Sequence, residues 1–384
     1  MRLENMIKFV DPQVGKEEKE ALNAVIDSRY LAEGPVAREF EKLFGEFIKS
    51  KYTIVTSNGT TALHLAIEAL DIKPGDEIIT TPFTFIASSN SILFNGAIPV
   101  FADIDPETYN IDPEQIRAKI TDKTKAIMPV HIFGNPCDMK AIREIADENN
   151  LVIIEDACQS HGAFYDGKHT GTLGEVGCFS FYASKNLPFG EGGAIVTDNE
   201  ELKDNILCLR NHGRTPKGGY FHTRIGYNYR TSNLHAAVGV EQMKKLPEML
   251  KIRERNANML LKELDTLDGF AMQKVYKGAK HGWYIAAGRT DRKDLPAPKV
   301  VEKLKEADIG SRQIYSVPSY KQPAYIDIND YYYWAKYVKF PDYSKVSCPI
   351  AERIGESHFQ IPINSGVTKE NMNHIIETLR KIFS

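Results

Sequence analysis

Seven short runs of β-branched and aromatic residues, separated by helical patterns, constrain the fold of this chain more than any other feature. They lie at residues 52–57, 77–82, 98–104, 126–133, 151–157, 177–183 and 193–198. Between most of them apolar residues recur with helical spacing, as at Leu63, Ala66, Ile67 and Leu70. This alternation predicts an α/β fold whose mostly parallel sheet is flanked by helices on both faces. A short glycine-rich segment joins the last two runs, so one of them can run antiparallel.

The second half of the chain does not continue the alternation of strand and helix patterns. Residues 210–230 lack periodicity and are rich in Gly, aromatic and basic residues, which predicts a functional loop rather than a simple connection. A helix begins near Ser232, and we expect Pro247 to kink or break it. Short strand-like runs and a final helix capped by Thr368 follow. We therefore expect a large domain over residues 1–248 and a smaller α+β domain over residues 249–384.

The composition excludes several classes of protein. The 384 residues carry a formal net charge of −3, so the chain lacks the excess of Lys and Arg typical of proteins that bind nucleic acid or acidic membranes. The first residues lack the layout of a secretory signal, and no apolar run reaches the roughly 18 residues of a membrane span. The five cysteines are widely spaced without a CxxC pair, which indicates neither disulfides nor a zinc site. We expect a cytoplasmic globular protein without a bound metal.

Lys185 is the first candidate for chemistry. It ends a short aromatic run that reads as a buried strand, and it precedes a glycine-dense turn at residues 190–193, where backbone can approach a ligand closely. Burial favours the neutral amine, which is the form that attacks a carbonyl group. Lys185 is therefore a candidate Schiff-base residue. The alternative is a lysine at a strand end whose ammonium group reaches water.

Two further stretches at the ends of predicted strands suit a ligand. Residues 57–62 come directly before a helix, where free backbone N–H groups can hold a phosphate, although Ser57 or Thr60 can also serve as a simple N-cap. Phe85 follows the next strand, where its ring can stack on a planar molecule or pack under a helix. The carboxyl ends of parallel strands meet at one edge of a sheet, so we expect these residues to lie close together.

Asp156 completes the pattern. It leaves a buried strand at the same edge, where a carboxylate needs a cation or strong donors, and a protonated pyridine nitrogen is a fitting partner. The alternative is an aspartate that caps the next turn, and nearby Gln159 can reach a ring hydroxyl. A phosphate cradle, an aromatic ring, a buried acid and a lysine at one sheet edge together predict a site for pyridoxal 5'-phosphate (PLP).

With these motifs the chain resembles the sugar aminotransferases of the DegT/DnrJ/EryC1/StrS group. That group lies within the aspartate aminotransferase-like enzymes, PLP fold type I, which have a seven-stranded sheet and a smaller C-terminal domain. The resemblance covers nearly the whole chain. It rests on GP (34–35), FE (40–41), SNGTTA (57–62), PFTFIA (82–87), PVH (129–131), EDA (155–157), SKNLPFGEGG (184–193), RNHG (210–213) and GYNYR (226–230).

The resemblance implies a role for each residue of the cofactor site. Lys185 would form the Schiff base, Asp156 would face the pyridine nitrogen, Gln159 would lie near the ring oxygen, and Phe85 would stack on the ring. The phosphate would be bound by residues from two strand ends and from the neighbouring subunit. These are Gly59, Thr60 and Ser180 from the same chain, and Asn228 from the neighbour. The family thus implies a homodimer with shared active sites.

The resemblance also implies the reaction. L-glutamate would donate an amino group to a keto group of a nucleotide-linked sugar, as in the biosynthesis of amino sugars and polysaccharides. Tyr315, Tyr320 and Arg230 are candidate substrate residues. The chain has Pro318-Ser319-Tyr320 and Pro362-Ile363-Asn364 where relatives often have Pro-Leu-His. These departures leave the identity of the sugar open.

Three other functions remain as alternatives. A PLP-dependent sugar dehydratase of this family has histidine in place of Lys185, and a non-catalytic regulatory homologue would be expected to lose Lys185 or Asp156. A nicotinamide dehydrogenase would carry GxGxxG after the first strand, and this chain does not. We expect His131 and His212 to have structural roles. The aromatic residues 331–334 are expected in surface or interface packing, with a sugar site as the alternative.

Overall fold

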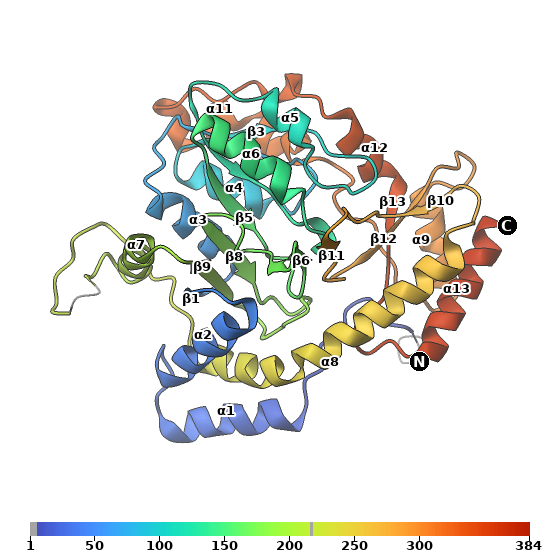
Figure 1. Cartoon of the computed structure of the whole chain (residues 1–384), viewed down its shortest axis with the longest axis horizontal. Coiled ribbons are helices and arrows are strands. Elements are labelled where there is room, and N and C mark those ends of the chain that lie inside the picture. The colour runs from blue at the N-terminus through green and yellow to red at the C-terminus, as the bar shows by residue number, and fades with distance from the viewer. Residues whose placement is uncertain (1–5, 216–217) are drawn as a thin grey trace.

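The computed structural model describes residues 6–215 and 218–384. Seven strands form its central sheet: β1 Tyr52–Thr56, β2 Glu77–Thr80, β3 Ile98–Phe101, β4 Thr124–Met128, β5 Val152–Asp156, β8 Val176–Ser180 and β9 Gly193–Thr197. Their order is β1-β9-β8-β5-β4-β2-β3 (Figure 1). The strands from β8 to β3 pair in parallel, whereas β9 runs antiparallel to β1 and β8. The predicted mostly parallel sheet with one reversed strand is confirmed.

Helices cover both faces of this sheet, because successive strand residues point to opposite sides. Ile54 packs with α3 (Gly59–Ala69) and α7 (Glu200–Arg210), whereas its neighbour Val55 packs with α2 (Pro35–Ile48). Farther along the sheet, Ile153 packs against α6 (Met139–Asn149), on the face opposite Ile154. The other helices of this part are α1 Lys16–Ser28, α4 Ala87–Phe94 and α5 Pro113–Arg117.

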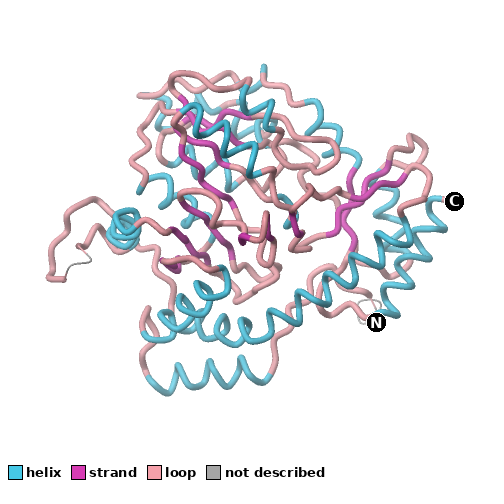
Figure 2. The backbone as a smooth tube through the Cα atoms, in the orientation of Figure 1, coloured by secondary structure: helices cyan, strands magenta, loops and turns pink. Residues whose placement is uncertain are grey.

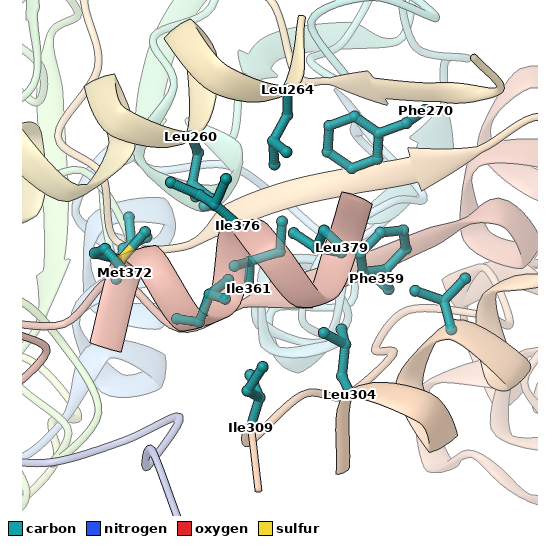
Figure 3. Packing of buried hydrophobic residues seen from close by; sticks show 14 of the residues in the cluster. Leu260, Leu264, Phe270, Leu304, Ile309, Phe359, Ile361, Met372, Ile376 and Leu379 are labelled. Carbon is teal, nitrogen blue, oxygen red and sulfur yellow. The ribbon is translucent and has the colours of Figure 1, made fainter. Parts of the chain in front are cut away.

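A second core lies at the other end of the molecule. Strands β10 (Phe270–Met272), β12 (Ala286–Thr290) and β13 (His358–Ile361) form a small antiparallel sheet. The helices α9 (Ala297–Glu306) and α13 (Lys369–Phe383) complete this core. Figure 3 shows Met372, Ile376 and Leu379 of α13 among its apolar side chains. The final helix begins after Thr368, as expected from the sequence.

One long helix, α8 (Asn233–Leu264), joins the two cores (Figure 1). Its first half packs against the central sheet through Ala236 and Leu246, and its second half enters the small core through Leu260 and Leu264. The sequence-based domain boundary at residue 248 falls between these halves. The helix continues through Pro247, so of the expected kink or break, the break is wrong. Packing on both sides of the proline outweighs the hydrogen bond that it removes.

Part of the C-terminal third packs on the large sheet rather than in the small core. Its short elements are η2 Ser319–Lys321, α10 Pro323–Ile326, α11 Ile328–Tyr331, η3 Tyr333–Lys336, η4 Tyr343–Lys345 and α12 Pro349–Ser357. Tyr320, Tyr325 and Tyr343 are buried against Phe101 of β3. The segment between residues 314 and 354 therefore supports the sheet edge from outside. In Figure 2, loops (pink) make up much of this region.

The remaining elements are short. They are η1 Ile132–Gly134 and a three-stranded sheet of β6 Phe164–Tyr165, β7 Lys168–His169 and β11 Ala279–Lys280. Within residues 6–215 and 218–384, no helix is long and apolar enough to cross a membrane. In the same described residues no cluster of three or more His, Cys, Asp or Glu side chains is arranged to hold a metal ion.

Candidate active site

A cavity of about 990 Å³ opens at the carboxyl ends of β5 and β8. Its wall combines the first turn of α3, the loop before α4, the ends of both strands and residues 312–315. Parallel strands bring the first three of these segments together, because their carboxyl ends meet at one edge, whereas residues 312–315 reach the cavity from the second half of the chain. Eight of the residues singled out in the sequence line this cavity: Gly59, Thr60, Phe85, Asp156, Gln159, Ser180, Lys185 and Tyr315.

The N-terminus of α3 has the shape and the free donors of an anion cradle. Asn58 caps the helix, because its side chain accepts a hydrogen bond from Thr61 N at 2.9 Å, so neither Ser57 nor Thr60 is the cap. The N–H groups of Gly59 and Thr60 donate to no group in the part of the chain that the structure describes. A Cβ at Gly59 would lie 2.7 Å from the Ser180 Cβ. Glycine therefore keeps this end of the helix close to β8, which fits a phosphate.

Asp156 is a buried carboxylate without a cation. Only 4% of the residue is exposed. Its Oδ2 accepts a hydrogen bond from Ser88 Oγ at 2.7 Å, and its Oδ1 accepts one from Cys158 N at 3.1 Å. No Lys, Arg or His among the described residues forms an ion pair with it. A buried charge with only neutral donors calls for a positively charged partner, and the protonated ring nitrogen of PLP fits that position.

The preceding residue, Glu155, is fully satisfied by the protein itself. His131 Nε2 lies 2.9 Å from Oε2, and the backbone N–H groups of Gly171, Leu173 and Gly174 donate at 2.6–2.7 Å. His131 Nδ1 accepts a hydrogen bond from a backbone N–H, so the ring proton lies on Nε2 and points at the carboxylate. This network fixes the end of β5, and it gives His131 the structural role that the sequence predicts.

The amine of Lys185 lies against an aromatic ring. Its Nζ is 4.3 Å from the centroid of Tyr284, and the Tyr284 hydroxyl lies 2.8 Å from Ser184 Oγ. Among the described residues, no carboxylate pairs with this amine. Burial raises the pKa of Tyr284, but the charge of Lys185, the bond to Ser184 and the charge of Arg312 outweigh it, so the pKa is lowered. The lysine is therefore held at the cavity wall without a fixed counter-ion.

The glycines after Lys185 serve the protein rather than a ligand. A Cβ at Gly192 would lie 2.0 Å from the Phe189 ring, and one at Gly193 would lie 2.4 Å from the Asn58 carbonyl oxygen. Neither glycine lines the cavity. The turn does reach the cavity through Glu191, so the expectation that it approaches a ligand fails only for these two glycines. They let the turn fold over Phe189 and let β9 pass the cap of α3.

The side chain of Gln159 is held by two residues whose backbone is strained, Phe133 and Tyr315. Its Oε1 accepts a hydrogen bond from Phe133 N at 3.0 Å, and its Nε2 lies 3.5 Å from the Tyr315 hydroxyl. Phe133 and Tyr315 have φ values of 59° and 58°, which are rare for aromatic residues, and their rings stack. Phe85 lines the same cavity and is 60% exposed, so its ring is free to stack on a bound molecule.

Asn228 lies outside the cavity of its own chain, on the loop of residues 211–231. Tyr227 and Tyr229 stack on each other and contact His64 of α3 at a tilted angle, and the Tyr227 hydroxyl donates to Glu68 at 2.7 Å. Asn228, between them, is exposed. Figures 1 and 2 show the described parts of this loop, residues 211–215 and 218–231, projecting from the body of the molecule.

Two candidate substrate residues and one histidine also lie outside the cavity. Arg230 is bonded to Asn211. Tyr320, contrary to expectation, is fully buried; it donates to Glu352 at 2.5 Å and accepts from Cys348 N at 2.9 Å, so it supports packing. His212 is exposed in a turn with φ 58°.

The aromatic patch of residues 331–334 packs against the end of α4. The Tyr332 hydroxyl donates to Leu93 O at 2.9 Å, and Trp334 Nε1 donates to Phe94 O at 3.2 Å. The patch therefore covers a helix end and does not line the cavity. Sequence reasoning missed Tyr284 and Arg312, which do line it. Tyr284 lies just before β12 and Arg312 follows α9, in the second half of the chain, where no motif indicated that they fold back onto the sheet.

This chain is similar to known proteins over nearly its whole length. GDP-perosamine synthase of Caulobacter vibrioides is 34% identical, with 98% of this chain and 98% of that protein covered. The X-ray structure of S. venezuelae DesV in complex with a ketimine intermediate has a TM-score of 0.86 and 33% identity, covering 95% of this chain and 94% of that one.

A third relative carries a cofactor. The structure of NtdA from Bacillus subtilis, with bound cofactor PMP, has a TM-score of 0.86 and 28% identity, covering 96% of this chain and 83% of that one. The family model that matches this chain, over residues 12–380, is the DegT/DnrJ/EryC1/StrS aminotransferase family. With its fold, its cavity and its sequence in agreement, the chain belongs to the DegT/DnrJ/EryC1/StrS aminotransferase family.

Proposed function

We propose that this PLP-dependent aminotransferase moves an amino group from L-glutamate to a keto group of a nucleotide-linked sugar. The observation that carries the proposal is the set of unmatched groups in one cavity. Among residues 6–215 and 218–384, Lys185 has no counter-ion, Asp156 has no cation, and the N–H groups at the N-terminus of α3 donate to no group. Relatives named for amino-sugar synthesis support the choice of substrate. We also propose that the enzyme acts in the cytoplasm.

The cavity offers one complementary group for each part of PLP. Asp156 would face the ring nitrogen, Phe85 would stack on the ring, and Gly59 with Thr60 and Ser180 would hold the phosphate. When bound, PLP supplies an aldehyde group that accepts the amine and a ring that withdraws electrons from the reacting carbon. The positions of these residues on rigid strand ends and a helix start keep the site ordered before any ligand binds.

Lys185 is the proton carrier of the reaction. The net change exchanges the amino group of the donor for the carbonyl oxygen of the sugar, so one C–H bond breaks on the donor and another forms on the sugar. Lys185 Nζ takes the proton from the donor α-carbon and delivers one to the sugar carbon. The ring of Tyr284, held by Ser184, keeps this amine at the wall between the two events.

A homodimer is the second part of the proposal. The loop of residues 211–231 exposes large apolar side chains, with Tyr220 80%, Phe221 71% and Ile225 90% exposed. Exposed apolar side chains grouped on a projecting loop are typical of an interface. Asn228 is exposed between two tyrosines that pack against α3, which suits a side chain that reaches the phosphate in a neighbouring subunit.

The test combines two variants. Lys185→Ala is expected to lose the visible absorbance of bound PLP and to keep less than about 1% of amino-group exchange with glutamate. Asn228→Ala is expected to lower activity about tenfold or more, because the phosphate loses a donor. Turnover is measured with glutamate and a panel of nucleotide keto sugars by mass spectrometry. A Lys185→Ala enzyme with full turnover would refute the proposed function.

Mixing the two variants tests the shared site. Each mixed dimer keeps one complete site if Asn228 acts across the interface, so refolding the two together should restore about a quarter of wild-type activity. If Asn228 acts within its own chain, no mixed dimer has a complete site and mixing restores nothing. That result would contradict the proposal that the site is shared between subunits, but it would not contradict the proposed aminotransferase activity.

A further inference from the structure

Arg312 is a positively charged residue of the cavity wall, and it is not among the residues proposed above to hold the cofactor. It follows the helix α9 and forms an isolated antiparallel bridge with Gln360 of β13, in which Gln360 N donates to Arg312 O at 2.9 Å. The adjacent Ser311 Oγ donates to the Gln360 carbonyl at 2.7 Å. The backbone at Arg312 is thus fixed to the small sheet, while its side chain lines the cavity.

The guanidinium group is held in place but has no anion. Arg312 Nε donates to Gln360 Oε1 at 2.9 Å, and the group lies 4.4 Å from the centroid of Phe9. Within residues 6–215 and 218–384, no carboxylate forms an ion pair with it, and its two terminal nitrogens donate to no protein acceptor. The buried Arg210, by contrast, pairs with Glu33 at 2.6 Å. A fixed fork of donors without an acceptor suits a planar anion from the substrate.

The position of Arg312 relative to the amine of Lys185 indicates which anion of the substrate Arg312 binds. The charges of both Arg312 and Lys185 act on the hydroxyl of Tyr284, so all three groups share one wall. In an amino acid the carboxylate is bonded to the carbon that loses its proton to Lys185. It must therefore lie close to that amine. In a nucleotide sugar the phosphates are separated from the keto carbon by the sugar ring and lie farther away.

We propose that Arg312 binds the α-carboxylate of the amino-acid donor. This inference rests on the proposed aminotransferase function and adds the residue that recognises the donor. Gln360 is its positioning residue: it is fully buried and holds Nε, which directs the two terminal nitrogens toward the cavity. A two-point contact with a carboxylate places the α-carbon of the donor beside Lys185.

The experiment separates the two halves of the reaction. The PLP-loaded enzyme is mixed with L-glutamate without sugar, and the change in visible absorbance gives the affinity and rate of the donor half. The PMP-loaded enzyme is then mixed with the keto sugar. Arg312→Gln should weaken glutamate binding about 100-fold, because hydrogen bonds to a charged group are lost, and leave the acceptor half within about twofold. Arg312→Lys should keep part of the affinity.

Controls make the result specific. Arg353→Gln removes the same charge from the exposed surface of α12 and should leave both halves unchanged. Gln360→Leu should weaken glutamate binding less than Arg312→Gln does. L-alanine lacks the second carboxylate. The Arg312→Gln variant should lose as much affinity for L-alanine as it does for L-glutamate. Calorimetric binding of glutarate, a dicarboxylate without an amine, should also weaken in Arg312→Gln.

Three results would overturn the proposal. If Arg312→Gln raises the KM for the sugar and spares glutamate, the residue binds a phosphate instead. If the loss occurs with glutamate but not with alanine, the residue binds the side-chain carboxylate. If none of the amino acids changes the absorbance of the PLP-loaded wild-type enzyme, the proposed function itself fails. The wild-type measurement therefore distinguishes that failure from the other two.

Discussion

At the scale of single residues, Glu155 and Asp156 show how one strand end can separate structure from chemistry. Glu155 receives donors from His131 and three backbone N–H groups, whereas Asp156 receives only two neutral donors. The sequence indicated Asp156, because a carboxylate that ends a buried run needs a partner. It did not indicate how Glu155 is satisfied, because its donors come from a loop that has no periodic pattern.

The charge of Asp156 should matter more than its hydrogen bonds. Asp156→Asn keeps an oxygen for Ser88 but removes the negative charge, and we expect kcat to fall at least about 100-fold. Ser88→Ala removes the donor 2.7 Å from Oδ2 and should lower kcat about tenfold. Steady-state kinetics at saturating PLP measures both. Equal losses in the two variants would show that the charge has no special role.

At the scale of elements, a buried ion network ties α2, β1 and α7 together. Arg210, at the end of α7, donates to Glu33 at 2.6 Å and to the Val55 carbonyl at 2.5 Å, and its Nη1 lies 3.5 Å from Glu41. Arg210 is 2% exposed. The projecting loop begins directly after Arg210, so this network anchors the base of the loop.

Breaking this network should destabilise the fold strongly. Arg210→Met removes the buried cation of Glu33 and Glu41 and leaves them the half-exposed Arg38, which pairs with them at 2.8 and 2.7 Å, so we expect the free energy of unfolding to fall by about 3 kcal/mol. Arg117→Met removes the same kind of side chain from an exposed pair with Glu148 and should cost about 0.5 kcal/mol. Urea unfolding measures both. A small loss for Arg210→Met would mean that the carboxylates find other donors.

Element boundaries differ in how well the sequence predicts them. All seven strands were predictable, because a buried parallel strand needs a continuous apolar run. The cap of α3 was assigned to Ser57 or Thr60 rather than Asn58, since all three residue types cap helices and only geometry selects one. The continuity of α8 through Pro247 was not predictable, because contacts with two separate cores override the local preference.

At the scale of the whole molecule, the structure folds parts of the second half back onto the first. Tyr284, Arg312 and Tyr315 reach the cavity, and the segment of residues 314–354 covers the sheet edge at β3. Short irregular elements carry no periodic signal, so the sequence indicated their existence but not their location. The roles of Lys185 and Asp156 were predictable because strand ends meet at one edge, whereas Arg312 belongs to no strand of that sheet.

Buried histidines should make the whole fold sensitive to acid. Burial lowers the pKa of His281 from 6.5 to about 3 and that of His64 from 6.5 to about 4. Below pH 6.5 the unfolded chain binds these protons and the folded protein does not. The free energy of unfolding should therefore fall by about 1.4 kcal/mol per imidazole and pH unit until the folded pKa is reached.

Urea unfolding between pH 7 and pH 5 checks this dependence. His281→Asn should make the slope with pH shallower. Gln273→Leu removes the partner 3.3 Å from His281 Nε2 but keeps the imidazole, so it should lower stability at every pH without making the slope shallower. An unchanged slope in His281→Asn would contradict the assignment of that proton uptake to His281.

The cavity wall, whose residues range from Val10 to Tyr315, has a consequence for biosynthesis. A ribosome releases the seven strands of the central sheet well before it releases Tyr284, Arg312 and Tyr315. Domains fold as units during synthesis, with the N-terminal part first. The nascent chain can therefore assemble its sheet, with Lys185 and Asp156 in place, while one wall of the pocket is still untranslated. Only the last third of translation encloses the amine.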